Sequence, residues 1–246
     1  MIRSRKEGIT MTAWTAAALA YALGALGFLL AAAYHKPWMQ HYPLAKGLAS
    51  AGFLLTALAH GLPRLASRAT VLLPGTGLSG LPWMGGLLAC LCLCAAGDVL
   101  LGLANARTGF FSRYFLAGAG CFTAAHAGLC ALFARFGGRA YPWELLLPLA
   151  LVGLAAGAAR ARHRFRLRRM AGAALVYSFF VGMMCAKAAV LALRTTQPLL
   201  AAGGVLFLAS DCVLLFLYFY YKPRRAFRAL NLITYYLGML CLALCA

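Results

Sequence analysis

The sequence has very few acidic residues. Only four of its 246 residues are Asp or Glu, against 23 Lys and Arg, which gives a formal net charge of +19. Charged residues of both signs make up only 11% of the chain, whereas 64% is hydrophobic and the mean hydropathy is +0.82. Soluble globular domains carry about 25% charged residues, so the composition excludes that class. We therefore predict an integral membrane protein.

Several features of metal and nucleotide sites are also missing. All nine cysteines fall in apolar runs, where cysteine behaves as a small hydrophobic residue and not as part of a disulfide framework. Cys90, Cys92 and Cys94 would scatter around a helix, whereas zinc needs converging ligands. No Gly-x-Ser-x-Gly elbow, His-Glu-x-x-His motif or phosphate-binding loop occurs in the sequence. We expect no metal and no cofactor.

The arginines lie mostly in short stretches between apolar runs. This distribution argues against nucleic acid, because nucleic-acid binding requires a folded basic surface. Anionic lipid headgroups are the expected partners of these side chains.

Eight apolar runs are long enough to cross a bilayer. They lie near residues 12–33, 43–62, 82–104, 115–135, 142–160, 170–193, 198–220 and 230–246. Their connections are short except for residues 63–81, whose Pro and Gly content indicates an irregular or partly re-entrant segment. The sequence thus predicts an all-α polytopic bundle of eight transmembrane helices, forming a single domain over residues 1–246.

Basic residues predict the orientation of the bundle. Thirteen Lys and Arg lie in the connections that follow the odd-numbered helices, and eight lie in the N-terminal tail and the other connections. The positive-inside rule therefore places the odd connections in the cytoplasm, in either a bacterial inner membrane or an organellar membrane. Arg3, Arg5 and Lys6 before the first helix favour the opposite orientation.

Two of the predicted helices share a motif. The third contains "AAGDVLLGL" and the seventh contains "LASDCVLLFL", each with a small residue, an Asp and a Val-Leu-Leu run. The second and sixth helices each contain a lysine, Lys46 and Lys187. This pattern predicts a four-plus-four internal repeat about an axis along the membrane normal.

Two of the four acidic residues lie inside apolar helices. Glu7 is in the N-terminal tail and Glu144 begins the fifth helix, where we expect water or headgroups to reach it. Asp98 and Asp211 have no such access, and their side chains are too short to extend to the interface, so they should face the bundle interior. A structural ion pair explains one such residue, but two in matching contexts favour a functional site.

Other polar residues lie at the same depth as the two aspartates. Because adjacent helices are antiparallel, Lys46, Tyr177 and Tyr235 all fall toward the odd connections, and we expect the five side chains to meet in a pocket open to one leaflet. His126 is interpreted either as a hydrogen-bonded core histidine or as a proton carrier.

The remaining intramembrane polar residues have simpler interpretations. We expect Lys187 to extend to the opposite interface and His60 to lie near an interface. Ser50 and Thr56 are expected to bond to neighbouring backbone.

Several of these motifs together resemble the YhhN-type lysoplasmalogenases, which are eight-helix membrane proteins. The resemblance rests on "LAKGLASAGFLL", "AAGDVLLGL", "AHAGLCALF", "VYSFFVGMMCAKAA", "GGVLFLASDCVLLF" and "ITYYLGML", in that order. It covers nearly the whole chain, and the Gly-Asp and Ser-Asp pair is its most specific part. The chain differs from the family pattern at Gly47, where Pro is frequent, and at Met239, where Gln is frequent.

The resemblance implies hydrolysis of the vinyl ether bond of a lysoplasmalogen to a fatty aldehyde and glycerophosphoethanolamine or glycerophosphocholine. This reaction needs an acid that protonates the alkene carbon and a carboxylate that stabilises the resulting oxocarbenium ion. Glycosidases meet the same demand with two carboxyl groups within about 10 Å of each other. We therefore interpret Asp98 and Asp211 as the acid and base, without assigning which is which.

Supporting roles follow from the same resemblance. Lys46 is expected to keep one aspartate ionised or to bind lipid phosphate, and Tyr177 and Tyr235 to orient the water or the glycerol hydroxyl. His126 is a further candidate for substrate binding. Two other classes remain open: a proton-coupled transporter or channel, which also uses intramembrane carboxylates, and a non-catalytic lipid-binding protein.

Overall fold

The computed structural model describes residues 12–66, 80–108, 112–137, 140–161, 163–165, 167, 170–221 and 226–246. Within these ranges, eight helices are long and apolar enough to cross a membrane. They are α1 (Ala13–Tyr34), α2 (Tyr42–Ala66), α3 (Gly80–Leu103), α4 (Arg113–Gly137), α5 (Leu146–Arg160), α6 (Ala171–Thr195), α7 (Pro198–Phe219) and α8 (Ala226–Ala243). Each lies within a few residues of a predicted span, which confirms the all-α polytopic bundle.

Local signals explain several helix ends. Thr12 caps α1, because its hydroxyl accepts a hydrogen bond from the Thr15 amide at 3.1 Å. Pro198 begins α7, where its fixed φ suits the first helical turn. In contrast, Pro63 lies inside α2, which continues to Ala66, so the segment predicted to be irregular begins later than expected; residues 67–79 lie outside the described ranges.

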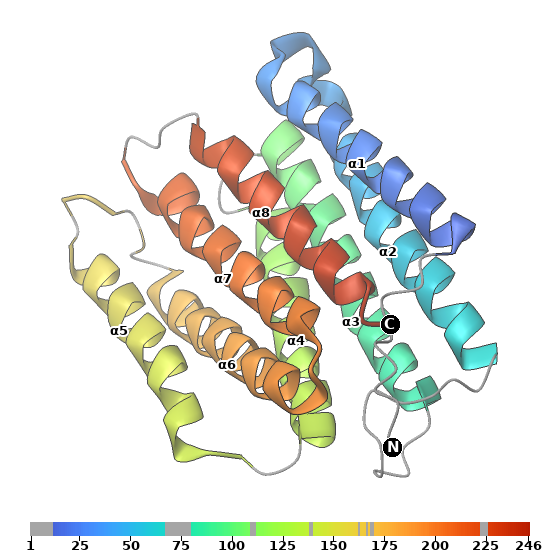
Figure 1. Cartoon of the computed structure of the whole chain (residues 1–246). Coiled ribbons are helices and arrows are strands. Elements are labelled where there is room, and N and C mark those ends of the chain that lie inside the picture. The colour runs from blue at the N-terminus through green and yellow to red at the C-terminus, as the bar shows by residue number, and fades with distance from the viewer. Residues whose placement is uncertain are drawn as a thin grey trace.

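The helices alternate in direction through the bundle. Helices α1, α3, α5 and α7 end, and α2, α4, α6 and α8 begin, on one side, at the top of Figure 1, and the C-terminus lies on the other. We call the first side the odd-connection face. Arg162, Arg166, Arg168 and Arg169, on which the predicted orientation depends, lie outside the described residues, so the cytoplasmic location of this face stays a prediction.

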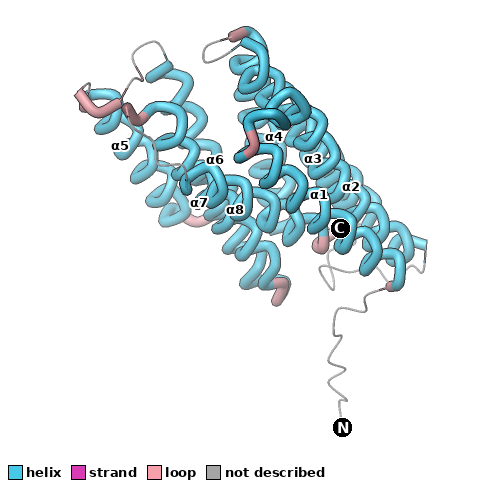
Figure 2. The backbone as a smooth tube through the Cα atoms, turned by 90° about the horizontal axis from the view of Figure 1, so that it is seen from above, coloured by secondary structure: helices cyan, strands magenta, loops and turns pink. Residues whose placement is uncertain are grey.

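The packing of the helices repeats between the two halves of the chain. Helices α1 to α4 pack in sequence, each on the next, and so do α5 to α8. Helix α4 packs on α6, and α8 packs on α2 in the corresponding way. Figure 2 shows the result from above, with α5 and α6 at one end of the bundle and α1 to α3 at the other. This pattern agrees with the predicted four-plus-four repeat.

Corresponding glycines allow the first two helices of each half to approach closely. A Cβ at Gly52 would lie 2.7 Å from the Cα of Ala22, and one at Gly182 would lie 2.6 Å from the Cα of Pro148. Contacts this short exclude any side chain, as is typical of helix pairs in membranes.

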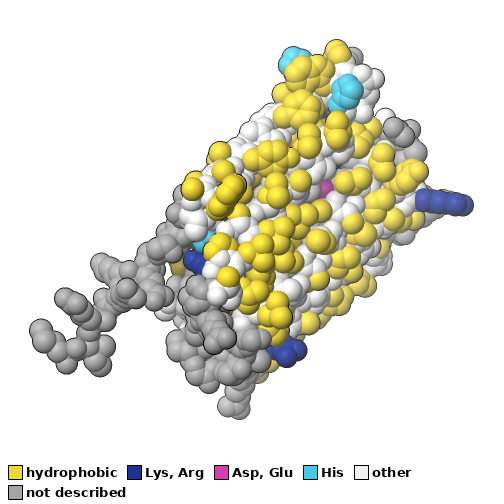
Figure 3. Space-filling model, turned by 90° about the vertical axis from the view of Figure 1, so that its right-hand side faces the viewer, with side chains coloured by type: hydrophobic (Ala, Val, Ile, Leu, Met, Phe, Trp, Pro, Cys, Tyr) yellow, Lys and Arg dark blue, Asp and Glu magenta, His cyan; other side chains and the backbone are white. Residues whose placement is uncertain are grey.

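The outer surface is apolar, as lipid contact requires. The face in Figure 3, the right-hand side of Figure 1, shows hydrophobic side chains over its middle and Lys and Arg toward its edges. Large exposed hydrophobic residues on α1, such as Trp14 and Leu23, are consistent with this environment. The chain is therefore a multi-pass membrane protein.

Two predictions about polar residues away from the site are wrong. Glu144 is only 2% exposed and Lys187 is held inside the bundle, because the Glu144 carboxylate, on the turn before α5, forms an ion pair of 2.5 Å with the Lys187 ammonium of α6. The pair arises because an acid and a base at the same depth neutralise each other within the bundle. His60 is buried against the C-terminal segment, and its position near an interface stays a prediction.

Candidate active site

Asp98 is completely buried and is surrounded by donors. The Lys46 Nζ lies 2.7 Å from its Oδ1. Its Oδ2 accepts from the hydroxyls of Ser50 at 2.8 Å, Tyr235 at 2.8 Å and Tyr236 at 3.2 Å. Lys46 and Ser50 are one turn apart on α2, so both face α3. Four donors, one of them an ammonium, match a carboxylate that only accepts, and this arrangement favours the ionised form of Asp98.

Asp211 has a different environment from Asp98. Its side chain is 8% exposed, and its Oδ2 lies 3.5 Å from the Nε2 of His126. Within the part of the chain that the structure describes, Asp211 forms no ion pair with a Lys or Arg. Tyr177 on α6 interacts with the Asp211 carboxyl, and its ring packs edge-on against the His126 imidazole with a centroid distance of 5.2 Å. The repeated fold therefore places two aspartates in unlike polar surroundings.

The orientation of the His126 ring is set by the backbone. Its Nδ1 lies 2.7 Å from the carbonyl oxygen of Phe122 on the preceding turn of α4. Phe207 packs against the ring from α7 with a centroid distance of 4.6 Å. Because a carbonyl oxygen can only accept, Nδ1 carries a hydrogen, and Nε2 is the atom that faces Asp211.

A small polar cavity joins the two aspartates. Its volume is about 20 Å³, which is enough for one water molecule. Polar side chains from five helices line it, namely Lys46, Asp98, Tyr177, Ser210, Asp211, Asn231 and Tyr235. Ser210 and Asn231 bond to each other, with the Asn231 Nδ2 donating to the Ser210 hydroxyl at 2.8 Å. The expectation that both aspartates face one cavity is thus met.

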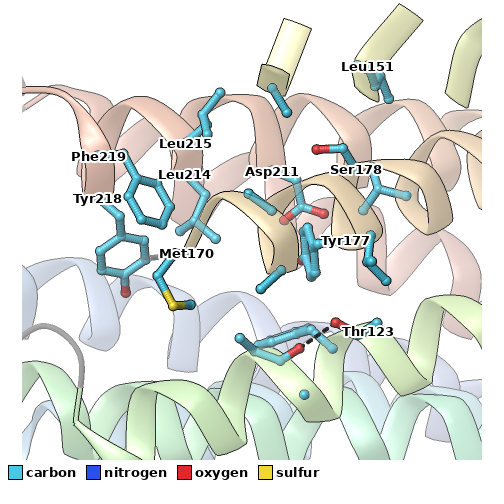
Figure 4. Close-up of a pocket in the computed structure, with 18 of the residues that line it drawn as sticks. Thr123, Leu151, Met170, Tyr177, Ser178, Asp211, Leu214, Leu215, Tyr218 and Phe219 are labelled. Carbon is cyan, nitrogen blue, oxygen red and sulfur yellow. Dashed lines mark hydrogen bonds between the residues drawn. The ribbon is translucent and has the colours of Figure 1, made fainter. Parts of the chain in front are cut away.

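A much larger apolar cavity adjoins the polar one. It has a volume of about 640 Å³ and is lined by residues of α3 to α7. Phe115 and Ala127 of α4 both line it, so it extends about 18 Å along that helix, in the half of the bundle nearer the odd-connection face. Asp211 and Tyr177 line both cavities, and Figure 4 shows their side chains in the wall of the larger one.

The wall of this apolar cavity has few free polar groups and contains small residues. The Thr123 hydroxyl donates to the Ala119 carbonyl at 2.9 Å, drawn as the dashed line in Figure 4. Gly120 and Gly172 line the cavity, and a Cβ at either would meet no atom within 4 Å. The cavity therefore exists partly because small side chains leave the space between α4 and α6 unfilled.

All six predicted site residues lie in this region. Lys46, Asp98 and Tyr235 form one cluster, and Tyr177, Asp211 and His126 form the other.

The predictions for two other polar residues of α2 had different outcomes. Ser50 was expected to bond to backbone, which is wrong, whereas Thr56 does donate to the Gly52 carbonyl at 2.8 Å. Sequence reasoning missed Tyr236; the adjacent tyrosines in "ITYYLGML" were the available signal.

Comparison with known proteins identifies one family. The model of the YhhN family matches residues 65–246. The matched region includes both aspartates, His126 and the three tyrosines of the site, whereas Lys46 and Ser50 precede it. No curated protein and no solved structure matches the chain.

Proposed function

The chain belongs to the YhhN family, and from this premise we propose that it hydrolyses the vinyl ether bond of alkenyl lysophospholipids. The products are a fatty aldehyde and a glycerophospho-headgroup. One observation carries the proposal: two buried carboxyl groups in unlike environments line a water-sized cavity that opens beside a large apolar cavity. The proposed reaction needs no metal and no cofactor.

The two cavities suit the two halves of the reacting group. The apolar cavity, whose volume lies within the usual range of about 300–1,000 Å³ for small-molecule sites, accepts the alkyl chain. Asp211 lines both cavities, so an alkene carbon at their junction lies beside its carboxyl group. The ether oxygen then points toward Lys46, Asp98 and Tyr235.

The chemistry follows from acid catalysis at this junction. A carboxyl group donates a proton to the alkene carbon distal to the oxygen, and the adjacent carbon becomes part of an oxocarbenium ion. The negative charge of the other carboxylate stabilises this cation. Water adds to the cationic carbon and loses a proton to the site, and the resulting hemiacetal breaks into the aldehyde and the glycerol hydroxyl.

The surrounding side chains support this chemistry. Lys46 and Ser50 hold the Asp98 carboxylate in place, and Tyr177 and Tyr235 are close enough to the polar cavity to orient the attacking water. Preorganised donors of this kind reduce the reorganisation that the transition state would otherwise require.

Aldehyde release tests the proposal directly. Purified protein in detergent, where no gradient exists, should release fatty aldehyde from an alkenyl lysophospholipid and should not release fatty acid from the matched ester lysophospholipid. A proton-coupled transporter would instead show uptake in liposomes without consuming the lipid. Lipid retention without turnover would identify a binding protein, and either outcome would overturn the proposal.

Filling the apolar cavity should reduce turnover of long chains. We expect Gly120→Leu to lower kcat/KM for a long-chain alkenyl substrate by about 10- to 200-fold, because the added side chain occupies the space of several methylenes, while a short-chain substrate is affected less. The control is Gly24→Leu on α1, since a Cβ at Gly24 also meets no atom within 4 Å but lies outside the cavity. Equal effects of the two variants, measured by aldehyde release across a chain-length series, would show that the cavity does not hold the chain.

A further inference from the structure

We propose that His126 and Asp211 share one proton and that this pair is the general acid of the site, with His126 as a positioning residue that keeps the shared proton available to the Asp211 carboxyl group. This inference rests on the proposed function and adds to it the assignment of acid and carboxylate, which the sequence leaves open.

The Phe122 carbonyl fixes the tautomer of His126. Its Nδ1 donates to the Phe122 carbonyl, so a neutral imidazole has its only lone pair on Nε2. This Nε2 is buried and has no hydrogen-bond partner, and the same is true of the Asp211 Oδ2 that lies 3.5 Å away. A neutral histidine beside an ionised aspartate would therefore place two lone pairs face to face in an apolar surrounding.

One proton between the two atoms removes this conflict. Either Asp211 is protonated and donates toward Nε2, or His126 is an imidazolium and donates toward Oδ2. Both forms are neutral as a pair, which buries no net charge, and both satisfy the two orphaned atoms. A small closing movement brings 3.5 Å into hydrogen-bonding range.

The groups around the pair do not supply another proton source of comparable strength. Tyr177 from α6 interacts with Asp211, while the Cys94 thiol of α3 and the Cys212 thiol of α7 lie near enough to interact electrostatically with Asp211. Phenols and thiols are ordinarily weaker acids than carboxyl groups and imidazolium. No Lys or Arg side chain of the described residues pairs with Asp211.

Asp98 cannot take the part of the acid in this arrangement. Its carboxyl oxygens already accept from the Lys46 ammonium and from three hydroxyls, which stabilise negative charge there, so Asp98 acts as the carboxylate of the site. The catalytic cycle is then closed: Asp211 gives its proton to the alkene carbon and becomes a carboxylate beside neutral His126, and the proton lost by the attacking water returns to the pair.

Infrared and nitrogen NMR spectroscopy of the substrate-free protein test the shared proton without relying on turnover. We expect either a carbonyl band of a protonated carboxyl group that disappears in Asp211→Asn, or a His126 imidazolium signal that changes in the same variant. A wild-type protein with a neutral His126 protonated only on Nδ1 and an ionised Asp211 would overturn the inference, even if the protein hydrolyses vinyl ethers.

Two substitutions of His126 separate a positioning role from a structural one. His126→Asn keeps a donor for the Phe122 carbonyl but has no atom at the Nε2 position, so we expect kcat to fall about 10- to 100-fold with KM little changed and the pH profile of kcat displaced. His126→Gln places an amide oxygen near the Nε2 position and should restore part of kcat. Wild-type kcat and pH profile in both variants would contradict the inference.

Discussion

Asp211→Asn is expected to lower kcat for aldehyde release by about 10²- to 10⁴-fold, the usual contribution of a general acid. The amide has nearly the same shape as the carboxyl group but no acidic proton for the alkene carbon. Because the apolar cavity is unchanged, KM for the alkenyl lysophospholipid should stay close to the wild-type value. The measurement is steady-state aldehyde release in detergent.

Asp98→Asn should reduce kcat by a similar factor for a different reason. The variant removes the negative charge that faces the oxocarbenium ion and leaves the Lys46 ammonium in its place, so the cation is repelled instead of stabilised.

The matched control for both variants is Glu144→Gln. It also removes one partner of a buried ion pair, here with Lys187 and away from the site, so it should destabilise the fold as the site variants do while the turnover of the folded protein is retained. Helix content by circular dichroism and a single gel-filtration peak show that each variant is folded. A folded double Asn variant that still releases aldehyde would refute the assignment of both aspartates.

The bundle was predictable because membrane crossing imposes a length on each helix. A run of about 20 apolar residues has few alternatives in a bilayer, and the depth of a residue follows from its position in the run. Depth alone placed Lys46, Asp98, Tyr177, Asp211 and Tyr235 at one level, and the structure brings them to the two clusters of one site.

The rotation of each helix about its own axis was not predictable in the same way. Lipid tails are as apolar as the interior of the bundle, so hydropathy does not indicate which face of a membrane helix is buried. The side chain of Ser50 was therefore assigned to backbone bonding, although it lies on the same face of α2 as Lys46 and donates to Asp98. For the same reason, hydropathy did not predict that Tyr236 bonds to Asp98 or that Glu144 pairs with Lys187 of another helix.

The apolar cavity had no sequence signal at all. It depends on where side chains are missing between packed helices, and a glycine such as Gly120 can equally well permit close packing, as Gly52 does against Ala22. Only the positions of the neighbouring helices decide between these two outcomes. The match to the family likewise says nothing about which glycines face a cavity.

Lys46→Met should destabilise the folded protein strongly. The substitution leaves the Asp98 carboxylate buried with hydroxyl donors but without its counter-charge, and removing one partner of a buried ion pair typically costs about 3–5 kcal/mol. The free energy of unfolding in mixed micelles, compared with that of the wild type, measures this cost. Lys46 interacts with the site from α2, so loss of the pair should also loosen the contact between α2 and α3.

The double variant Lys46→Met, Asp98→Asn distinguishes an uncompensated charge from lost packing. If the loss of stability comes from the unpaired Asp98 carboxylate, replacing it with Asn should recover most of that stability. The Asn oxygen still accepts from Ser50 and Tyr235, and no charge remains buried. The double variant should nevertheless stay inactive, since the negative charge of Asp98 is absent. If Asn at position 98 recovers none of the stability, Lys46 contributes through packing of its aliphatic stem, and the ion pair does not set the charge state of Asp98.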